Sequence, residues 1–181
     1  MTLFQPSLSE TPKWNETIFR QYEIKTLPKT TALTARFEGN YFEGETSGIV
    51  FGVLFDYIKA NHIKMTTPVL VYPDAHKMQF LVSAKQAEEI ANGKRAPLES
   101  TALVSIETLP ETKVMAYGIQ GAYTQARYQE GRSKLLTHLN GLKQWKTAGK
   151  EVIAFWSSPF TPSPLKHADV MLPIESVIED R

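Results

Sequence analysis

The sequence predicts an α+β fold, in which an antiparallel, barrel-like sheet is flanked by two long helices. Two observations predict this class: most segments alternate apolar and polar side chains as strands do, and the chain resembles itself. The pattern Ile-x-Thr-Leu-Pro-x-Thr occurs at residues 24–30 and again 82 positions later, at residues 106–112. Each half of the chain, about 22–83 and about 104–175, therefore forms a strand–strand–helix–strand–strand repeat.

The two repeats are expected to pack as one unit, because a single repeat is too small to bury both faces of its sheet. Further pairs align at the spacing of 82, namely Gly39 with Gly121, Tyr41 with Tyr123 and Leu54 with Leu136. At a spacing of 91 the aligned pairs are residues 65–69 (MTTPV) with 156–160 (WSSPF), and Leu81 with Leu172. Such a pair has a pseudo-twofold axis and a cleft where its halves meet, and ligands usually bind in clefts of this kind.

The first repeat is expected to contain four strands and one long helix. These elements cover residues 22–27, 30–37, 64–72 and 78–83 for the strands, and Thr46 or Ser47 to about Asn61 for the helix. Pro28 suits a hairpin turn between the first two strands. Pro68 has no N–H for a ladder, which indicates an edge or a bulge. The helix is apolar over most of its circumference, so it should pack on more than one side or line a pocket.

The second repeat follows a short helical turn over 85–91, which Asn92 and Gly93 close. Its expected elements are strands over 103–109, 113–119, 151–156 and 170–174, a helix over 125–143, and a proline-rich loop over 158–165. One stripe of that helix is apolar and is expected to face the core. The stripe consists of Tyr128, Leu135, Leu136, Leu139 and Leu142.

Composition narrows the possible functions. The chain has 181 residues, 42% of them apolar, which fits one globular domain over 21–181 after an extended lead-in over 1–20. The net charge of +1 does not indicate a nucleic-acid partner. The absence of cysteine excludes disulfides, cysteine-ligated metal centres and thiolate nucleophiles, and suits a reducing cytoplasm.

No membrane segment is expected. The N-terminal residues carry neither a basic region nor an apolar run typical of a secretory signal. The longest apolar stretch, 49–58, is interrupted by Gly52 and Asp56 and is well short of the ~20 residues that span a bilayer. We therefore expect a cytoplasmic protein.

Several segments resemble the SOUL, or haem-binding-protein, family. They are Tyr22-Glu23-Ile24, Glu38-Gly39-Asn40-Tyr41, Lys64-Met65-Thr66-Thr67-Pro68-Val69, residues 156–162 (WSSPFTP) and Lys166-His167-Ala168-Asp169-Val170. The Met-Thr-x-Pro-Val signature is the most specific of these, and the resemblance covers about residues 22–174 in order.

The resemblance implies a distorted β-barrel flanked by two helices, built by duplication and related to GyrI-like effector-binding domains. It also implies that haem or another tetrapyrrole binds in a pocket formed by the first helix and nearby strands. The residues of this chain that match the pocket are Phe51, Leu54, Phe55, Ile58, His62 and Met65. Some family members use a histidine near the first strand as iron ligand, whereas residues 22–28 (YEIKTLP) contain none.

The four histidines of the chain are candidate axial ligands for haem iron, which binds His, Met, Tyr or Cys. His62 is the preferred candidate, although a histidine at a helix C-terminus also suits the helix dipole without any ligand. His76 is expected in a solvated turn, His138 beside the core stripe and His167 in a structural loop.

Aromatic and basic residues complete the expected site. The aromatic side chains predicted to bound the cleft, or else to fill the core, are Tyr41, Tyr57, Tyr117, Tyr123, Trp156 and Phe160, of which Tyr117 and Trp156 are taken as ligand-binding. The basic residues nearest to the pocket in sequence, as candidates for haem propionates, are Lys59, Lys64 and Arg127.

These observations favour a non-enzymatic binding protein for haem, a related tetrapyrrole or another flat amphipathic molecule, with no other cofactor and no protein partner indicated. A GyrI-like domain that binds or sequesters cationic or drug-like compounds is the alternative, and it needs Glu38 or Glu107 inside the cleft. Two further readings are a hydrolase with a Glu base and Tyr donors in the same cleft, and an interaction module using residues 159–164. No nucleophile-elbow, zinc-protease, P-loop or dinucleotide-binding motif is present.

Overall fold

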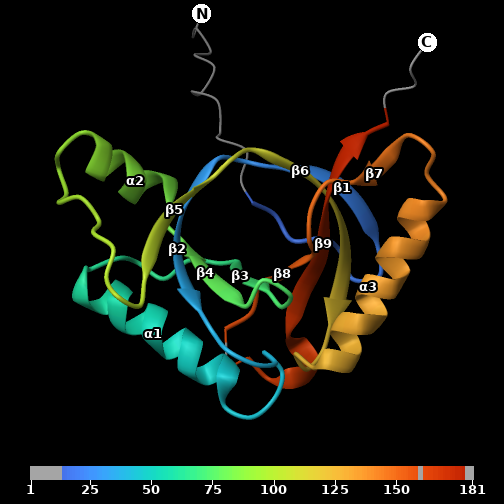
Figure 1. Ribbon diagram of the computed structural model, residues 1–181, viewed down its shortest axis with the longest axis horizontal. Helices are drawn as coiled ribbons and strands as arrows, with labels where there is room; N and C mark the ends of the chain where they lie inside the picture. The colour runs from blue at the N-terminus through green and yellow to red at the C-terminus, as the bar shows by residue number, and fades with distance from the viewer. Residues whose placement is uncertain (1–13, 159–160, 178–181) are drawn as a thin grey trace, which may run out of the picture.

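The computed structural model describes residues 14–158 and 161–177. Its strands form one open, curled antiparallel sheet, a half-barrel with the helices on its outside (Figure 1). The elements are β1 (Tyr22–Leu27), β2 (Thr30–Arg36), α1 (Thr46–Ala60), β3 (Val69–Tyr72), β4 (Lys77–Leu81), α2 (Ala84–Ala91), β5 (Ser105–Leu109), β6 (Thr112–Gln120), α3 (Gln125–Asn140), β7 (Trp145–Thr147), β8 (Val152–Phe155), the 3₁₀ turn η1 (Ser163–Leu165) and β9 (His167–Ser176). The expected α+β class is confirmed.

The order of the strands shows the pseudo-twofold axis. Along the sheet they run β1-β6-β9-β8-β3-β4-β2-β5. Exchanging β1 with β5, β2 with β6, β3 with β8 and β4 with β9 reverses this order onto itself. The register agrees, because β2 places Leu33 opposite Ile106 of β5, and β6 places Met115, 82 positions after Leu33, opposite Ile24 of β1. The axis therefore passes between β3 and β8, where Val71 pairs with Ile153.

The predicted hairpin between the first two strands is wrong. β1 pairs with β6, and β2 pairs with β4 and β5, so each repeat lends its first strand to the other repeat. The exchange gives both first strands a hydrogen-bonding partner across the axis and joins the halves into one sheet. Both segments are strands, as their alternating patterns predict, but alternation specifies which face a side chain occupies and not which strand lies beside it.

The alignment at a spacing of 91 is also wrong. β4 sets Phe80 opposite Leu33, and β9 sets Leu172 opposite Met115, so the equivalent of Leu172 is Phe80, at a spacing of 92. Thr67-Pro68 precedes β3, whereas Ser158 follows β8. Because β3 and β8 run antiparallel, with Val69 opposite Phe155, residues 67–68 and 156–158 adjoin paired ends of the two strands across the axis and are not equivalent.

Some boundaries differ from the expected ones. β3 begins at Val69, since the preceding Pro68 has no N–H to donate. Glu45 is the residue before α1, and no side chain caps that end, while Thr124 caps α3 by accepting from the N–H of Arg127. The three-residue β7 pairs with β9 and was not expected.

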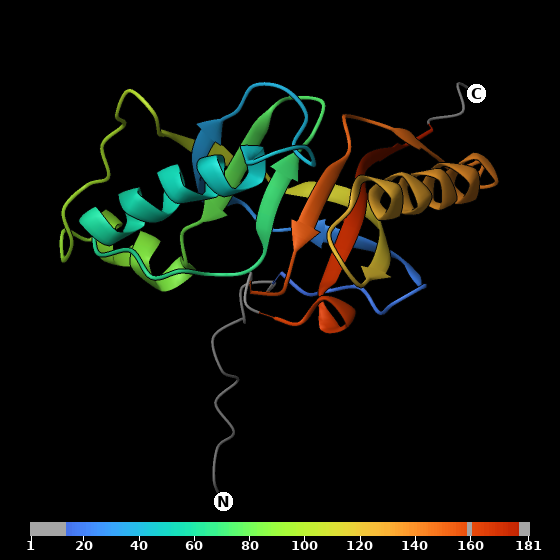
Figure 2. The same ribbon diagram turned by 90° about the horizontal axis from the view of Figure 1, so that it is seen from below.

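The two long helices, α1 and α3, cover the same face of the sheet, one on either side of the axis (Figure 2). α1 buries one side only, through Val50, Leu54, Tyr57 and Ile58, and leaves Ile49 and Phe55 exposed. The expectation that α1 packs on more than one side is thus not met among the described residues. α3 buries the predicted positions Tyr128, Leu135 and Leu139, while Leu136 and Leu142 are half-buried.

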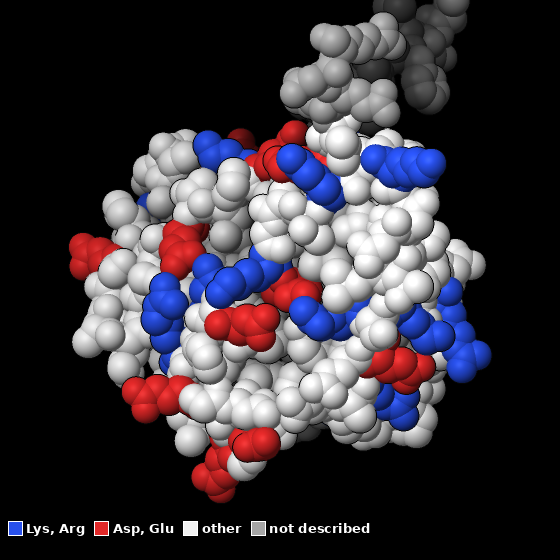
Figure 3. Space-filling view, turned by 45° about the vertical axis from the view of Figure 1, so that its right-hand side comes forward, with Lys and Arg blue, Asp and Glu red and all other residues white. Residues whose placement is uncertain are grey.

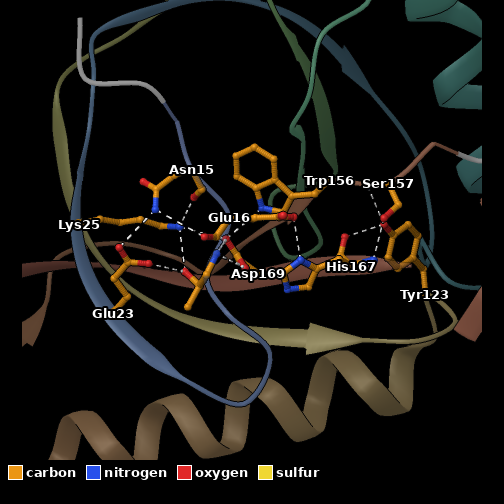
Figure 4. Close-up of polar contacts among 10 residues, drawn as sticks. Asn15, Glu16, Glu23, Lys25, Tyr123, Trp156, Ser157, His167 and Asp169 are labelled. Carbon is orange, nitrogen blue, oxygen red and sulfur yellow. Dashed lines mark hydrogen bonds and ion pairs between the residues drawn. The ribbon is translucent and has the colours of Figure 1, made fainter. Parts of the chain in front are cut away.

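The opposite face, inside the curl, has its own small core and a buried ion pair. Residues 14–21 run along it, and Gly118 allows their close approach, since a Cβ there would lie 2.4 Å from the Ile18 carbonyl oxygen. Lys25 Nζ lies 3.0 Å from Asp169 Oδ2 and also donates to the Asn15 carbonyl and the Thr17 hydroxyl (Figure 4).

Asp169 accepts hydrogen bonds from the Thr17 N–H and Trp156 Nε1 as well. Burial raises the pKa of the Asp169 carboxyl, while Lys25 and these donors act in the opposite direction. The pseudo-twofold relates Lys25 to Glu107 and Asp169 to Lys77, which form a second ion pair at 3.7 Å. The same pair thus recurs with its charges exchanged and at greater exposure.

Candidate functional site

A groove of about 590 Å³ lies where the two repeats meet. Three elements form it: the segment after β2, the turn between β3 and β4, and the first half of α3. Its lining residues are Gly39, Asn40, Tyr41, Phe42, Pro73, Asp74, His76, Gln125, Tyr128, Gln129 and Arg132. The first repeat supplies the loop and the turn and the second supplies the helix, so neither repeat contains this site alone.

One side of the groove is aromatic. The Phe42 ring stacks on Tyr128 at a centroid distance of 5.7 Å and meets Tyr41 edge-on at 5.1 Å. Tyr41 in turn stacks on Phe155 of β8 at 6.0 Å. Burial raises the pKa of Tyr128 to about 12 and also that of Tyr41 above its ordinary value, so both phenols stay protonated at neutral pH. This side suits a flat, apolar ligand surface.

The remaining sides are polar. Asn40 Nδ2 donates to Gln125 Oε1 at 3.2 Å, and Asn40 Oδ1 accepts from the Phe42 N–H, which ties the loop to the start of α3. Arg132 Nε donates to Glu151 Oε1 at 2.6 Å, and this bond raises the pKa of the guanidinium further. Beside its aromatic side the groove thus has the Arg132 guanidinium, ion-paired with Glu151, the Asp74 carboxylate and the amide groups of Asn40, Gln125 and Gln129.

His76 is the groove residue that sequence reasoning placed in solvent and did not select. Its ring Nδ1 lies 3.0 Å from the Gly39 carbonyl oxygen, and its ring meets the edge of Phe37 at 5.6 Å. The backbone is held by the Phe37 N–H, which donates to the His76 carbonyl, and it has a φ of 52°. The histidine is exposed, as expected, but it borders the groove because β2 and the β3–β4 turn end side by side.

The predicted α1 residues lie elsewhere. Leu54 and Ile58 are buried in the core. The half-buried Phe51 meets the core residue Phe80 edge-on at 5.1 Å and stacks on the exposed Phe55 at 5.9 Å. The half-buried Met65 packs against the same core, and His62 is exposed beyond the end of α1. The structure therefore brings Phe51 and Phe55 together, but none of these residues lines the groove.

Of the predicted aromatic residues, Tyr41 borders the groove, and Tyr123 packs behind it against Phe155 at 4.3 Å. Tyr57 and Tyr117 are buried in the core. Trp156 lies on the opposite face of the sheet, bonded to Asp169. Phe160 and residue 159 of the proline-rich loop lie outside the described residues.

The other charged and histidine residues considered from the sequence do not line the groove. Glu38 is exposed, and Glu107 lies on the inner face, bonded to Gln79 and Lys77, so neither carboxylate faces the groove. His138 stacks on Tyr22 at 3.9 Å beside a shallower pocket of about 510 Å³, and His167 Nδ1 lies 2.8 Å from Glu16. Arg127 donates to the Gln120 carbonyl. Within the described ranges, no three His, Asp or Glu side chains are grouped to hold a metal ion.

Comparison with protein families identifies the chain. A family model described as SOUL heme-binding protein matches residues 9–173. The chain belongs to the SOUL family. A comparison with curated proteins found no match.

The C-terminal domain of EcmrR is 11% identical to this SOUL protein and superposes with a TM-score of 0.65, covering 87% of this chain and 98% of that one. A structure described as a hydrolase from Listeria innocua is 15% identical, with a TM-score of 0.55, covering 87% and 93%. At such identities the likeness shows the shared fold alone.

Two further observations concern the charges on one face of the protein and the length and hydropathy of its helices. Lys, Arg, Asp and Glu side chains are interspersed on the face shown in Figure 3, without a large area of one sign. None of the helices within residues 14–158 and 161–177 is long and apolar enough to cross a membrane.

Proposed function

We propose that this SOUL protein binds haem, a related tetrapyrrole or another flat amphipathic molecule reversibly in the groove between its repeats. The observation that carries the proposal is the pairing of an aromatic side, made by Phe42, Tyr41 and Tyr128, with a polar side that includes Arg132. A tetrapyrrole with carboxylate substituents has the same division into a flat apolar body and an anionic edge. A cysteine-free chain suits action in the cytoplasm.

The size and residues of the groove suit such a ligand. The groove has a volume of about 590 Å³, within the ~300–1,000 Å³ of small-molecule sites. The rings of Phe42 and Tyr128 would contact the macrocycle, and the guanidinium of Arg132 would pair with a carboxylate. Bound haem would supply a redox-active iron centre that a histidine could bind. The competing site that the sequence predicts is the surface formed by Phe51 and Phe55 of α1 with His62 and Met65 just after it; the predicted Tyr117 and Trp156 lie apart from that surface.

Replacing Phe42 by alanine is expected to weaken hemin affinity by about tenfold, because one aromatic contact contributes roughly 0.5–1.5 kcal/mol beyond its buried area. Phe55→Ala is the matched control, since Phe55 is a partly exposed aromatic residue outside the groove, and its effect should stay within about twofold. Hemin titrations followed by the Soret band measure both variants against the unaltered protein, with far-UV circular dichroism to check the fold.

The opposite result would move the site. If Phe55→Ala weakens hemin binding and Phe42→Ala does not, the α1 surface is the ligand site. If the unaltered protein shows only unsaturable absorbance and no 1:1 end point, hemin binds nonspecifically and tetrapyrrole binding is refuted.

A flat cationic compound is the second candidate ligand, because the Asp74 carboxylate borders the same aromatic groove. Competition distinguishes the two: a lipophilic cation that displaces hemin in the unaltered protein, and no longer does so in Asp74→Asn, would support it.

A further inference from the structure

We propose that His76 is the axial ligand of haem iron in this protein, binding through Nε2 while the Gly39 carbonyl holds its Nδ1–H. The inference rests on the proposed function, since it names the residue of the inter-repeat groove that would contact the metal. It replaces the sequence-based candidate His62 with a residue from the β3–β4 turn.

The hydrogen bond to Gly39 determines which ring nitrogen is available. A carbonyl oxygen only accepts hydrogen bonds, so the 3.0 Å contact places a proton on Nδ1 of His76. In the neutral ring, the lone pair is then on Nε2. Histidines that bind metals commonly donate their other N–H to a carbonyl or carboxylate, which fixes the ring orientation and increases its basicity.

The position of His76 is fixed by its surroundings. Its carbonyl accepts from the Phe37 N–H at 3.0 Å, and its own N–H donates to the Pro73 carbonyl. Its φ of 52° is a left-handed conformation that costs a non-glycine residue about 1–2 kcal/mol. The edge of the Phe37 ring limits the rotation of the imidazole. A strained backbone that holds a ring in one orientation at the border of a groove is typical of functional positions.

The other side chains of the groove are poorer ligands. Among its lining residues, only His76, Tyr41 and Tyr128 belong to the types that bind haem iron. A tyrosine ligand must be a phenolate, and burial raises the pKa of both phenols well above neutral pH. Of the remaining described histidines, His138 is stacked on Tyr22, His167 contacts Glu16, and His62 is outside the groove.

His76→Asn tests the inference, with His62→Asn as its matched control. Both histidines are exposed and have a positive φ, of 52° and 53°, and asparagine adopts that conformation readily. Each protein is titrated with hemin and with metal-free protoporphyrin IX, and the hemin complexes are examined by absorption and electron paramagnetic resonance spectroscopy. His76→Gly, which also accepts a positive φ, is titrated with added imidazole.

We expect His76→Asn to lose the ligand-field spectrum of the unaltered hemin complex and to weaken hemin binding by about 10–100-fold. Its affinity for metal-free protoporphyrin should change less than about twofold, and imidazole should restore the spectrum of His76→Gly. His62→Asn should match the unaltered protein.

The outcomes separate the two proposals. If the unaltered protein binds both porphyrins at 1:1 and the His76→Asn spectrum is unchanged, or His62→Asn loses it instead, the ligand assignment is overturned while the binding function stands. If neither porphyrin saturates the unaltered protein, the proposed function fails, and the ligand assignment fails with it.

Discussion

Replacing Asp169 by alanine is expected to lower the free energy of unfolding by about 3–5 kcal/mol, the cost of leaving one charge of a buried pair without its partner. Asp169 is 0% exposed and Lys25 is 9% exposed. Removing the carboxylate leaves the buried Lys25 ammonium with the Asn15 carbonyl and the Thr17 hydroxyl as its acceptors, and it frees the Thr17 N–H and Trp156 Nε1 as well. Urea unfolding followed by circular dichroism measures the change.

The chain contains its own control for this substitution. Lys77 and Glu107 are the pseudo-twofold equivalents of Asp169 and Lys25, but their side chains are 21% and 31% exposed. Lys77→Met should therefore cost less than about 1 kcal/mol, as exposed ion pairs do. The double variant Lys25→Met/Asp169→Leu should recover most of the loss, because the unpaired charge is gone. Equal costs for Asp169→Ala and Lys77→Met would contradict this account of the inner face.

Replacing Leu135 by alanine is expected to destabilise the protein by about 2–5 kcal/mol, through lost burial and the cavity left between α3 and the sheet. Leu135 is 0% exposed and belongs to the main core. Its neighbour Leu136 is only half-buried, so Leu136→Ala should cost clearly less. Thermal and urea unfolding of the two variants compare the same chemical change one residue apart; a larger loss for Leu136→Ala would show that α3 packs with a different face.

The repeat is the part of the fold that the sequence predicted best. The Ile-x-Thr-Leu-Pro-x-Thr pattern recurs at a spacing of 82, and the same spacing relates Leu33 to Met115 in the hydrogen-bond register. Alternation also placed side chains on the correct faces, with Leu33 and Met115 in the helix-side core. The repeated pattern and the alternation are both properties of short segments. They predict the structure because each strand keeps one face toward a core.

The partners of the strands could not be predicted in the same way. The short link at Pro28 looked like a hairpin, yet β1 and β2 lie far apart in the strand order. The partner of each first strand is set by the contacts between the two repeats. The side chains of β1 do not specify whether it pairs with β2 or with β6. The alignment of residues 65–69 with 156–160 is wrong for a related reason, because its described residues, up to Ser158, follow β8 while residues 65–68 precede β3, and strand ends that meet across a twofold axis need not be equivalent.

The groove was harder still to foresee. Asn40, His76 and Gln129 come from a loop, a turn and a helix that the strand exchange brings together. The family resemblance directed attention to α1, whose apolar residues are divided between the core and an exposed surface. A histidine in a polar turn resembles any solvated histidine, and only its hydrogen bond to Gly39 distinguishes it.

Chemical-shift mapping with a diamagnetic porphyrin tests the central claim, that ligand binds between the repeats, most directly. ¹H–¹⁵N spectra of the labelled protein would be recorded during titration with gallium protoporphyrin IX. We predict that the largest saturable changes fall on the backbone amides of Asn40, Phe42, His76 and Gln129, which lie in both repeats. Changes confined to Phe51, Phe55, His62 and Met65 would contradict the account and place the ligand on α1.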